Sequence, residues 1–323
     1  MNNRLLYPDI IKFLAIFLVT WSHCAQVVSG QTWTNFMGGI ELDLAINMPL
    51  FMIISGWFLN LDKIRKSKAI DYALQKFKRL IVPSVVWYFI HLFLSFKFPG
   101  LSIFSYYWYL NGLFLCLCII MLASKIIRND IVCIIITLLL ILLCPYTNFC
   151  HINFMLPFLW AGYGLRKVFE SKNCVIFVLI SFIIGIVIFP YWNHDFTVYK
   201  APFNSIKFND YMLIAFLYRF IIGFCLSVPI IYLAYMFEKC FAGIASYVAD
   251  LGRYSLVIYT SSLAILGFVK RCLNLFDLHT NQYAIIDILS LLMCLAIIAI
   301  TIMYSNLCRK NRTLKLMFLG EFK

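Results

Sequence analysis

Lys12 and His23 are two ionisable residues inside the first apolar stretch of the sequence, where charge is costly in a membrane. Eleven residues at about 100° each return to within about 20° of the starting direction, so both side chains share one face of a helix, roughly 16 Å apart along its axis. Asp9 precedes Lys12 by three residues and can pair with it. A cation near one end and an imidazole deeper inside indicate a path for a substrate.

His23 is suited to proton transfer because an imidazole, with its unperturbed pKa of about 6.5, takes up and returns a proton near neutral pH. Acyl transfer to a hydroxyl group requires such a step. The same position also fits a buried histidine that hydrogen-bonds a neighbouring helix, or a proton-relay group of a transporter. The spacing alone leaves these interpretations open.

Two arginines and a serine are further candidates for substrate binding. Arg79 either snorkels to lipid headgroups or binds a substrate phosphate at the inner face. Ser55 either contacts the substrate or forms, with Gly56, a small-residue pair that lets two helices approach closely. Arg219 lies within an apolar stretch and is expected to act in the site.

Arg219 needs a partner in such surroundings, for which Asp43, Glu41 or an anionic substrate is suitable. His91 also lies within an apolar stretch and competes with His23 by depth alone. The sequence around each histidine is therefore needed to choose between them.

The whole sequence has the composition of an integral membrane protein. Of its 323 residues 63% are hydrophobic and 13% are charged, with a mean hydropathy of +0.90, whereas a soluble domain is about 45–50% apolar and 25% charged. We expect an all-α polytopic membrane protein with a single domain over residues 1–323 and about ten transmembrane helices. The expected helices are at residues 10–28, 43–61, 80–96, 108–124, 131–149, 152–166, 174–191, 211–236, 254–269 and 283–304.

The basic residues predict the orientation in the membrane. Residues 63–79 contain seven Lys and Arg and residues 29–42 contain none, while Arg309, Lys310, Arg312 and Lys315 follow the last expected helix. By the positive-inside rule both termini are then cytoplasmic. Residues 63–83 are basic with apolar residues at helical spacing, so they lie along the inner face or form a solvated basic loop.

The sequence disfavours both a nucleic-acid partner and a metal site. The formal charge of +13 could suggest a nucleic-acid partner, but the Lys and Arg cluster in interhelical loops, so we expect none. The twelve cysteines form no C-x-x-C pair and several lie in apolar stretches. We therefore predict no metal site.

The first stretch, YPDIIKFLAIFLVTWSH, resembles the start of the membrane-bound acyltransferase family 3, bacterial enzymes that O-acylate surface polysaccharides. In that family an aspartate precedes an arginine, ten residues and a histidine, and Asp9, Lys12 and His23 occupy these positions. Lysine keeps the charge of arginine but loses its bidentate fork.

Further segments resemble the family in the same order along the chain. They are MPLFMIISGWFL (48–59), KRLIVP (78–83), YYWYLNGLF (106–114), LPFLWAGYGLRK (156–167) and LGRYSLVIYTSS (251–262). In the last segment Ser262 stands where a histidine is often found, so no role for a second histidine is carried over.

The resemblance implies acetyl-CoA, or less often another acyl-CoA, as co-substrate, with no permanently bound cofactor. The acceptor would be a sugar hydroxyl of a polysaccharide or lipid-linked glycan, and the location the bacterial inner membrane. His23 would be the general base or an acyl carrier, Lys12 would bind donor phosphates or keep the opening electropositive, and Asp9 would orient Lys12.

The alternative is a transporter of glycan or lipid-linked sugar, in which His23, His91 and Arg219 line a path. The sequence shows neither repeated halves nor the paired broken helices that many transporters use. We therefore favour the enzyme.

Overall fold

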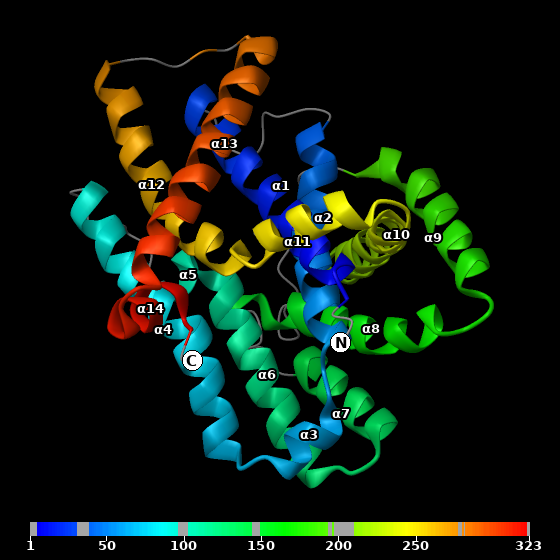
Figure 1. The fold of residues 1–323 in the computed structure, drawn as a ribbon. Helices are drawn as coiled ribbons and strands as arrows, with labels where there is room; N and C mark the ends of the chain where they lie inside the picture. Colours follow the sequence, from blue (N-terminus) through cyan, green and yellow to red (C-terminus); the bar gives the residue numbers. More distant parts are fainter. Residues whose placement is uncertain are drawn as a thin grey trace.

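A computed structural model describes residues 5–30, 39–95, 103–143, 149–192, 196, 210–276, 280 and 282–321 (Figure 1). Within these ranges the regular structure is helical. The α-helices are α1 (Tyr7–Ser29), α2 (Gly39–Trp57), α3 (Leu61–Lys66), α4 (Ala69–Ser95), α5 (Ile103–Tyr106), α6 (Trp108–Ile126), α7 (Asp130–Leu143), α8 (Ile152–Phe169), α9 (Cys174–Ile188), α10 (Asp210–Cys240), α11 (Ala242–Gly252), α12 (Ser255–Phe276), α13 (Tyr283–Cys308) and α14 (Arg312–Leu319).

The all-α membrane fold predicted from composition is confirmed for the described residues. Seven of their helices are long and apolar enough to cross a membrane, namely α1, α4, α6, α9, α10, α12 and α13. Each of the ten predicted segments overlaps one described helix, but α2 and α7 have shorter apolar parts and α8 is not among the seven. The chain is a multi-pass membrane protein, while the number of about ten spans stays a prediction.

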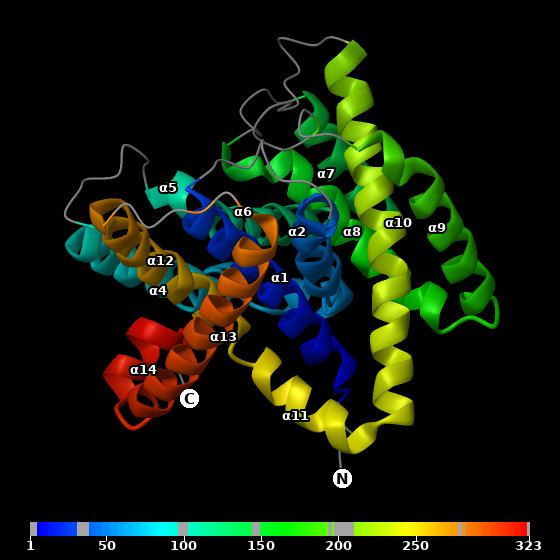
Figure 2. The same cartoon turned by 90° about the horizontal axis from the view of Figure 1, so that it is seen from above.

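Helix α1 is the central helix of the bundle. It packs against α2, α10, α11, α12 and α13, which surround it in Figure 2. Ile11, Ala15 and Ile16 of α1 are completely buried. The face that carries the candidate residues is therefore enclosed by elements from both halves of the sequence.

The start of α1 is fixed by a carboxylate from the end of α10. The two oxygens of Glu238 accept hydrogen bonds from the backbone N–H groups of Leu6 (3.0 Å) and Tyr7 (2.7 Å). These donors have no partner within the helix, and a negative charge there is favoured by the helix dipole. The turn that carries Asp9 is thus held beside the junction of α10 and α11 (Figure 2).

Helices α2 and α8 approach each other closely at two glycines. A Cβ atom at Gly56 would collide with the backbone oxygen of Leu159, and one at Gly162 with that of Ile53. Gly56 thus has the packing role considered for the Ser55–Gly56 pair, as expected where small residues let membrane helices meet. Ser55, one residue earlier, instead lines the cavity described below.

Gly162→Ala is expected to destabilise the protein by about 1–3 kcal/mol, because the added methyl group forces α2 and α8 apart. Gly164→Ala on the same helix is the control, because nothing lies within 4 Å of a Cβ atom there. Thermal unfolding of the two purified variants in detergent measures the difference. Equal melting temperatures would contradict this account of the α2–α8 contact.

Candidate functional site

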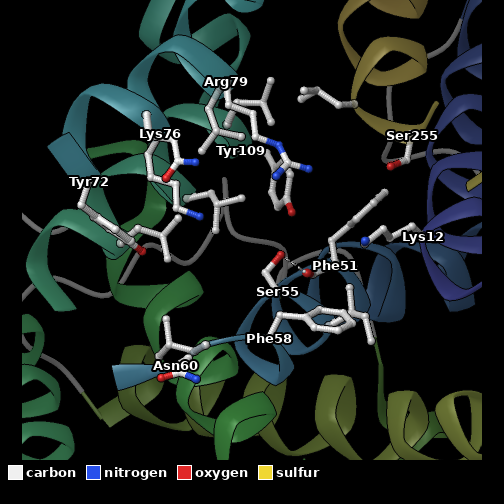
Figure 3. A pocket seen from close by; sticks show the side chains of 18 of the residues that line it. Lys12, Phe51, Ser55, Phe58, Asn60, Tyr72, Lys76, Arg79, Tyr109 and Ser255 are labelled. Carbon is white, nitrogen blue, oxygen red and sulfur yellow. Dashed lines mark hydrogen bonds between the residues drawn. The ribbon is translucent and has the colours of Figure 1, made fainter. Parts of the chain in front are cut away.

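A cavity of about 860 Å³ lies at the end of the bundle where α1 begins. Its walls come from α1, α2, α3, α4, α6 and the junction of α11 with α12 (Figure 3). The residues that line it are Asp9, Lys12, Phe51, Ile54, Ser55, Phe58, Leu59, Asn60, Lys63, Ile64, Ser67, Asp71, Tyr72, Gln75, Lys76, Arg79, Leu80, Tyr109, Leu110, Leu113, Leu117, Gly252, Arg253, Ser255, Leu256 and Tyr259.

The polar part of the cavity is cationic. Five basic side chains line it and only two acidic ones do. Lys12 and Lys76 lie on opposite sides, with the guanidinium of Arg79 between them (Figure 3). A concave surface with an excess of one charge concentrates ligands of the opposite charge. This cavity is therefore suited to an anion with several charged groups.

Lys12 is held by contacts on two sides. Its Nζ atom lies 3.1 Å from Oδ1 of Asp9 and 5.4 Å from the ring centroid of Phe58. Asp9 is 6% exposed, and a Cβ atom at Gly252 would collide with its backbone oxygen. The ion pair considered from the sequence is thus present, and the end of α11 packs directly on the turn that carries it.

One wall of the cavity is aromatic and carries hydroxyl groups. The ring of Tyr109 lies 5.6 Å from that of Tyr259 and 5.5 Å from that of Phe51, measured between centroids. Ser55 donates a hydrogen bond from Oγ to the backbone oxygen of Phe51 (2.8 Å). This wall suits the less polar part of a ligand whose charged part faces the basic residues.

His23 lies farther along α1, roughly 16 Å beyond Lys12. In the described part of the chain it is not among the residues that line the cavity. Ile16 and Val19 occupy the same helix face between the two residues and are 0% and 2% exposed. The structure thus separates Lys12 from His23 by a layer of packed side chains.

Arg219 is also absent from the residues that line the cavity in the described part of the chain. It is 4% exposed on α10, and its guanidinium carbon lies 5.4 Å from the ring centroid of Phe154 in α8. Asp43, one of its expected partners, accepts a hydrogen bond from Nδ2 of Asn47 (3.2 Å). The side chain of Glu41 lies outside the described residues.

The competing histidine, His91, is engaged with α5. Its ring lies 4.5 Å from that of Tyr106, and the hydroxyl of Tyr106 lies 3.1 Å from its Nδ1 atom. Ser262, at the position of the missing histidine, donates a hydrogen bond to the backbone oxygen of Tyr259 (3.2 Å).

The structure brings together four candidates, Asp9, Lys12, Ser55 and Arg79, from three helices. Three other basic side chains also line the cavity, and the sequence did not identify them individually. They are Lys63, Lys76 and Arg253. Lys63 and Lys76 belong to the basic segment that was used as a topology signal, and Arg253 lies in the LGRYSL motif. Their motif context was the signal that could have identified them.

Residues 5–305 match the family described as "Acyltransferase domain", the membrane acyltransferase family 3. The chain belongs to this family, as the sequence motifs predicted, and it is therefore an acyltransferase. No curated protein and no solved structure matches the chain significantly.

The contact between Gly252 and Asp9 can be tested through activity. Gly252→Ala should push α11 away from the first turn of α1 and shift the Asp9–Lys12 pair, because the added Cβ has no space. We expect acyl transfer per folded protein to fall on the order of 10- to 100-fold. Gly243→Ala on the same helix, where a Cβ meets nothing within 4 Å, should keep activity. Equal activity of the two variants would show that this contact does not position the site.

Proposed function

We propose that the protein transfers an acetyl group from acetyl-CoA to a hydroxyl group of a surface polysaccharide or lipid-linked glycan. The observation that supports this best is the cationic cavity at the start of α1, on the helix that also carries His23. The family match over residues 5–305 supports a single acyltransferase domain. It also argues against the transporter alternative.

The cavity is proposed to bind the donor. Coenzyme A carries a pyrophosphate and a ribose phosphate, and Lys and Arg side chains form strong charge-assisted hydrogen bonds with such groups. Lys12 and Arg79 face the same space from different helices (Figure 3). In the proposed bacterial inner-membrane location, the positive-inside rule favours the cytoplasmic side for this basic end, where acyl-CoA is available.

His23 is proposed to carry out the chemical step. As general base, its imidazole takes the proton of the acceptor hydroxyl while the oxygen attacks the thioester carbonyl, and the C–S bond breaks to release the thiolate of CoA. Alternatively, the imidazole itself attacks the thioester and carries the acyl group to the acceptor, with the same thiolate leaving. In both cases Ile16 and Val19 must move for the donor to reach His23.

His23→Ala is expected to abolish transfer of label from radioactive acetyl-CoA to glycan in isolated membranes, because no other group then takes the proton or the acyl group. His91→Gln is the comparison variant and should retain transfer. Both variants must be inserted and folded, which is judged by their presence in the membrane fraction and by a monodisperse peak after solubilisation in detergent. Full labelling with His23→Ala would refute the role of His23, and no labelling with the unaltered protein would refute the proposed reaction.

Lys12 is expected to act through its charge. Lys12→Arg should keep much of the activity because the cation and its partner Asp9 remain, whereas Lys12→Ala should raise the KM for acetyl-CoA by roughly tenfold or more. Initial rates at varied acetyl-CoA concentration measure this difference. If Lys12→Ala and Lys12→Arg have the same KM, Lys12 does not contact the donor.

A further inference from the structure

Residues 60–67, here called the α3 corner, connect α2 to α4 and form one side of the cavity. Asn60, Lys63 and Ser67 of this corner line the cavity. The positive charges of Lys63 and Arg79 both act on Lys76, which faces the corner from α4. A group of like charges in one corner is unfavourable unless an anion binds there.

The α3 corner is fixed from behind by Arg65. Its guanidinium donates hydrogen bonds to Oδ1 of Asp130 (2.7 Å) and to the backbone oxygen of Ser124 (3.2 Å). The hydroxyl of Tyr163 donates to the other oxygen of Asp130 (2.6 Å).

Lys125 at the end of α6 adds a second attachment, because its Nζ atom donates to the backbone oxygen of Ser67 (2.5 Å). The corner is therefore held to α6, α7 and α8 whether or not a ligand is present, so Lys63 is presented to the cavity by a rigid support. Such preorganisation reduces the entropy lost on binding.

The neighbouring residues of α4 suit the rest of a nucleoside. Tyr72 provides an aromatic ring, and Asp71 and Gln75 provide polar groups that can accept and donate hydrogen bonds. Aromatic rings commonly bind nucleobases by stacking, and because Nζ of Lys76 lies over one face of the Tyr72 ring, 5.3 Å from its centroid, a base would stack on the opposite face. All three residues line the cavity on the same helix as Lys76, and the ring of Tyr72 lies on the opposite side of the cavity from Lys12 (Figure 3).

We propose that the α3 corner is the subsite for the phosphorylated nucleoside end of the donor, with Lys63 and Lys76 binding the ribose 3′-phosphate. The inference rests on the proposed use of acyl-CoA. The cations of the cavity are separated in the same way as the phosphates of the donor. The donor has a pyrophosphate near the thioester arm and a monoester phosphate at its far end, and the cavity has Lys12 on one side and Lys76 on the other. A monoester phosphate carries about −1.5 to −2 charge at neutral pH.

The consequence is discrimination between acetyl-CoA and 3′-dephospho-acetyl-CoA. Loss of charge-assisted hydrogen bonds to a phosphate corresponds to a roughly ten- to hundredfold lower kcat/KM for the dephosphorylated donor. Lys63→Gln and Lys76→Gln should each reduce this preference severalfold or more, because each lowers kcat/KM for acetyl-CoA and leaves kcat/KM for 3′-dephospho-acetyl-CoA nearly unchanged. Lys66→Gln is the matched control, because Lys66 is an exposed lysine of α3 outside the described cavity lining.

The test is the ratio of kcat/KM values for the two donors, measured with the unaltered protein and these three variants. A preference lost in Lys63→Gln and Lys76→Gln but kept in Lys66→Gln supports the subsite. No preference in the unaltered protein, a preference kept in Lys63→Gln, or an equal loss in Lys66→Gln would overturn it while leaving the proposed reaction intact. Transfer from neither donor would instead refute the proposed reaction itself.

Discussion

The high free energy of a charge in an apolar helix bundle governs the structure of this protein. Asp9 inside the bundle is paired with Lys12, and five basic side chains are gathered around a cavity at one end. The Glu238 carboxylate satisfies the first N–H groups of α1 and so fixes the turn from which Lys12 projects. The position of Asp9 and Lys12 in the wall of the cavity depends on this arrangement at the start of α1.

The helices were largely predictable from the sequence, because membrane helices are set by length and hydropathy. The main difference is α4, which begins at Ala69 rather than near residue 80. Residues 69–79 are polar on average and include Lys76, Lys78 and Arg79, so hydropathy does not detect this part of the helix, although Ala, Leu, Lys and Arg form helices readily. A hydropathy limit marks the edge of the apolar region and not the end of the helix.

The site was predictable in part. Periodicity was sufficient to place Lys12 near Asp9, because both lie on one helix. It was not sufficient to show that Lys63 and Arg253 face the same cavity, because this depends on how α3 and α11 fold back against α1 and α6. Nor could it show that buried Ile16 and Val19 separate the cavity from His23. Contacts between distant segments determine these features.

The layer formed by Ile16 and Val19 has a consequence for the permeability of the bundle to ions. Water reaching His23 from the basic cavity would shorten the apolar barrier that keeps ions from crossing the bundle. Ile16 and Val19 are buried, and apolar side chains packed in this way leave no polar group to hold water between the cavity and His23. Any movement of these two side chains that admits a ligand therefore has to keep water out at the same time, so that ions do not follow the ligand into the apolar part of the bundle.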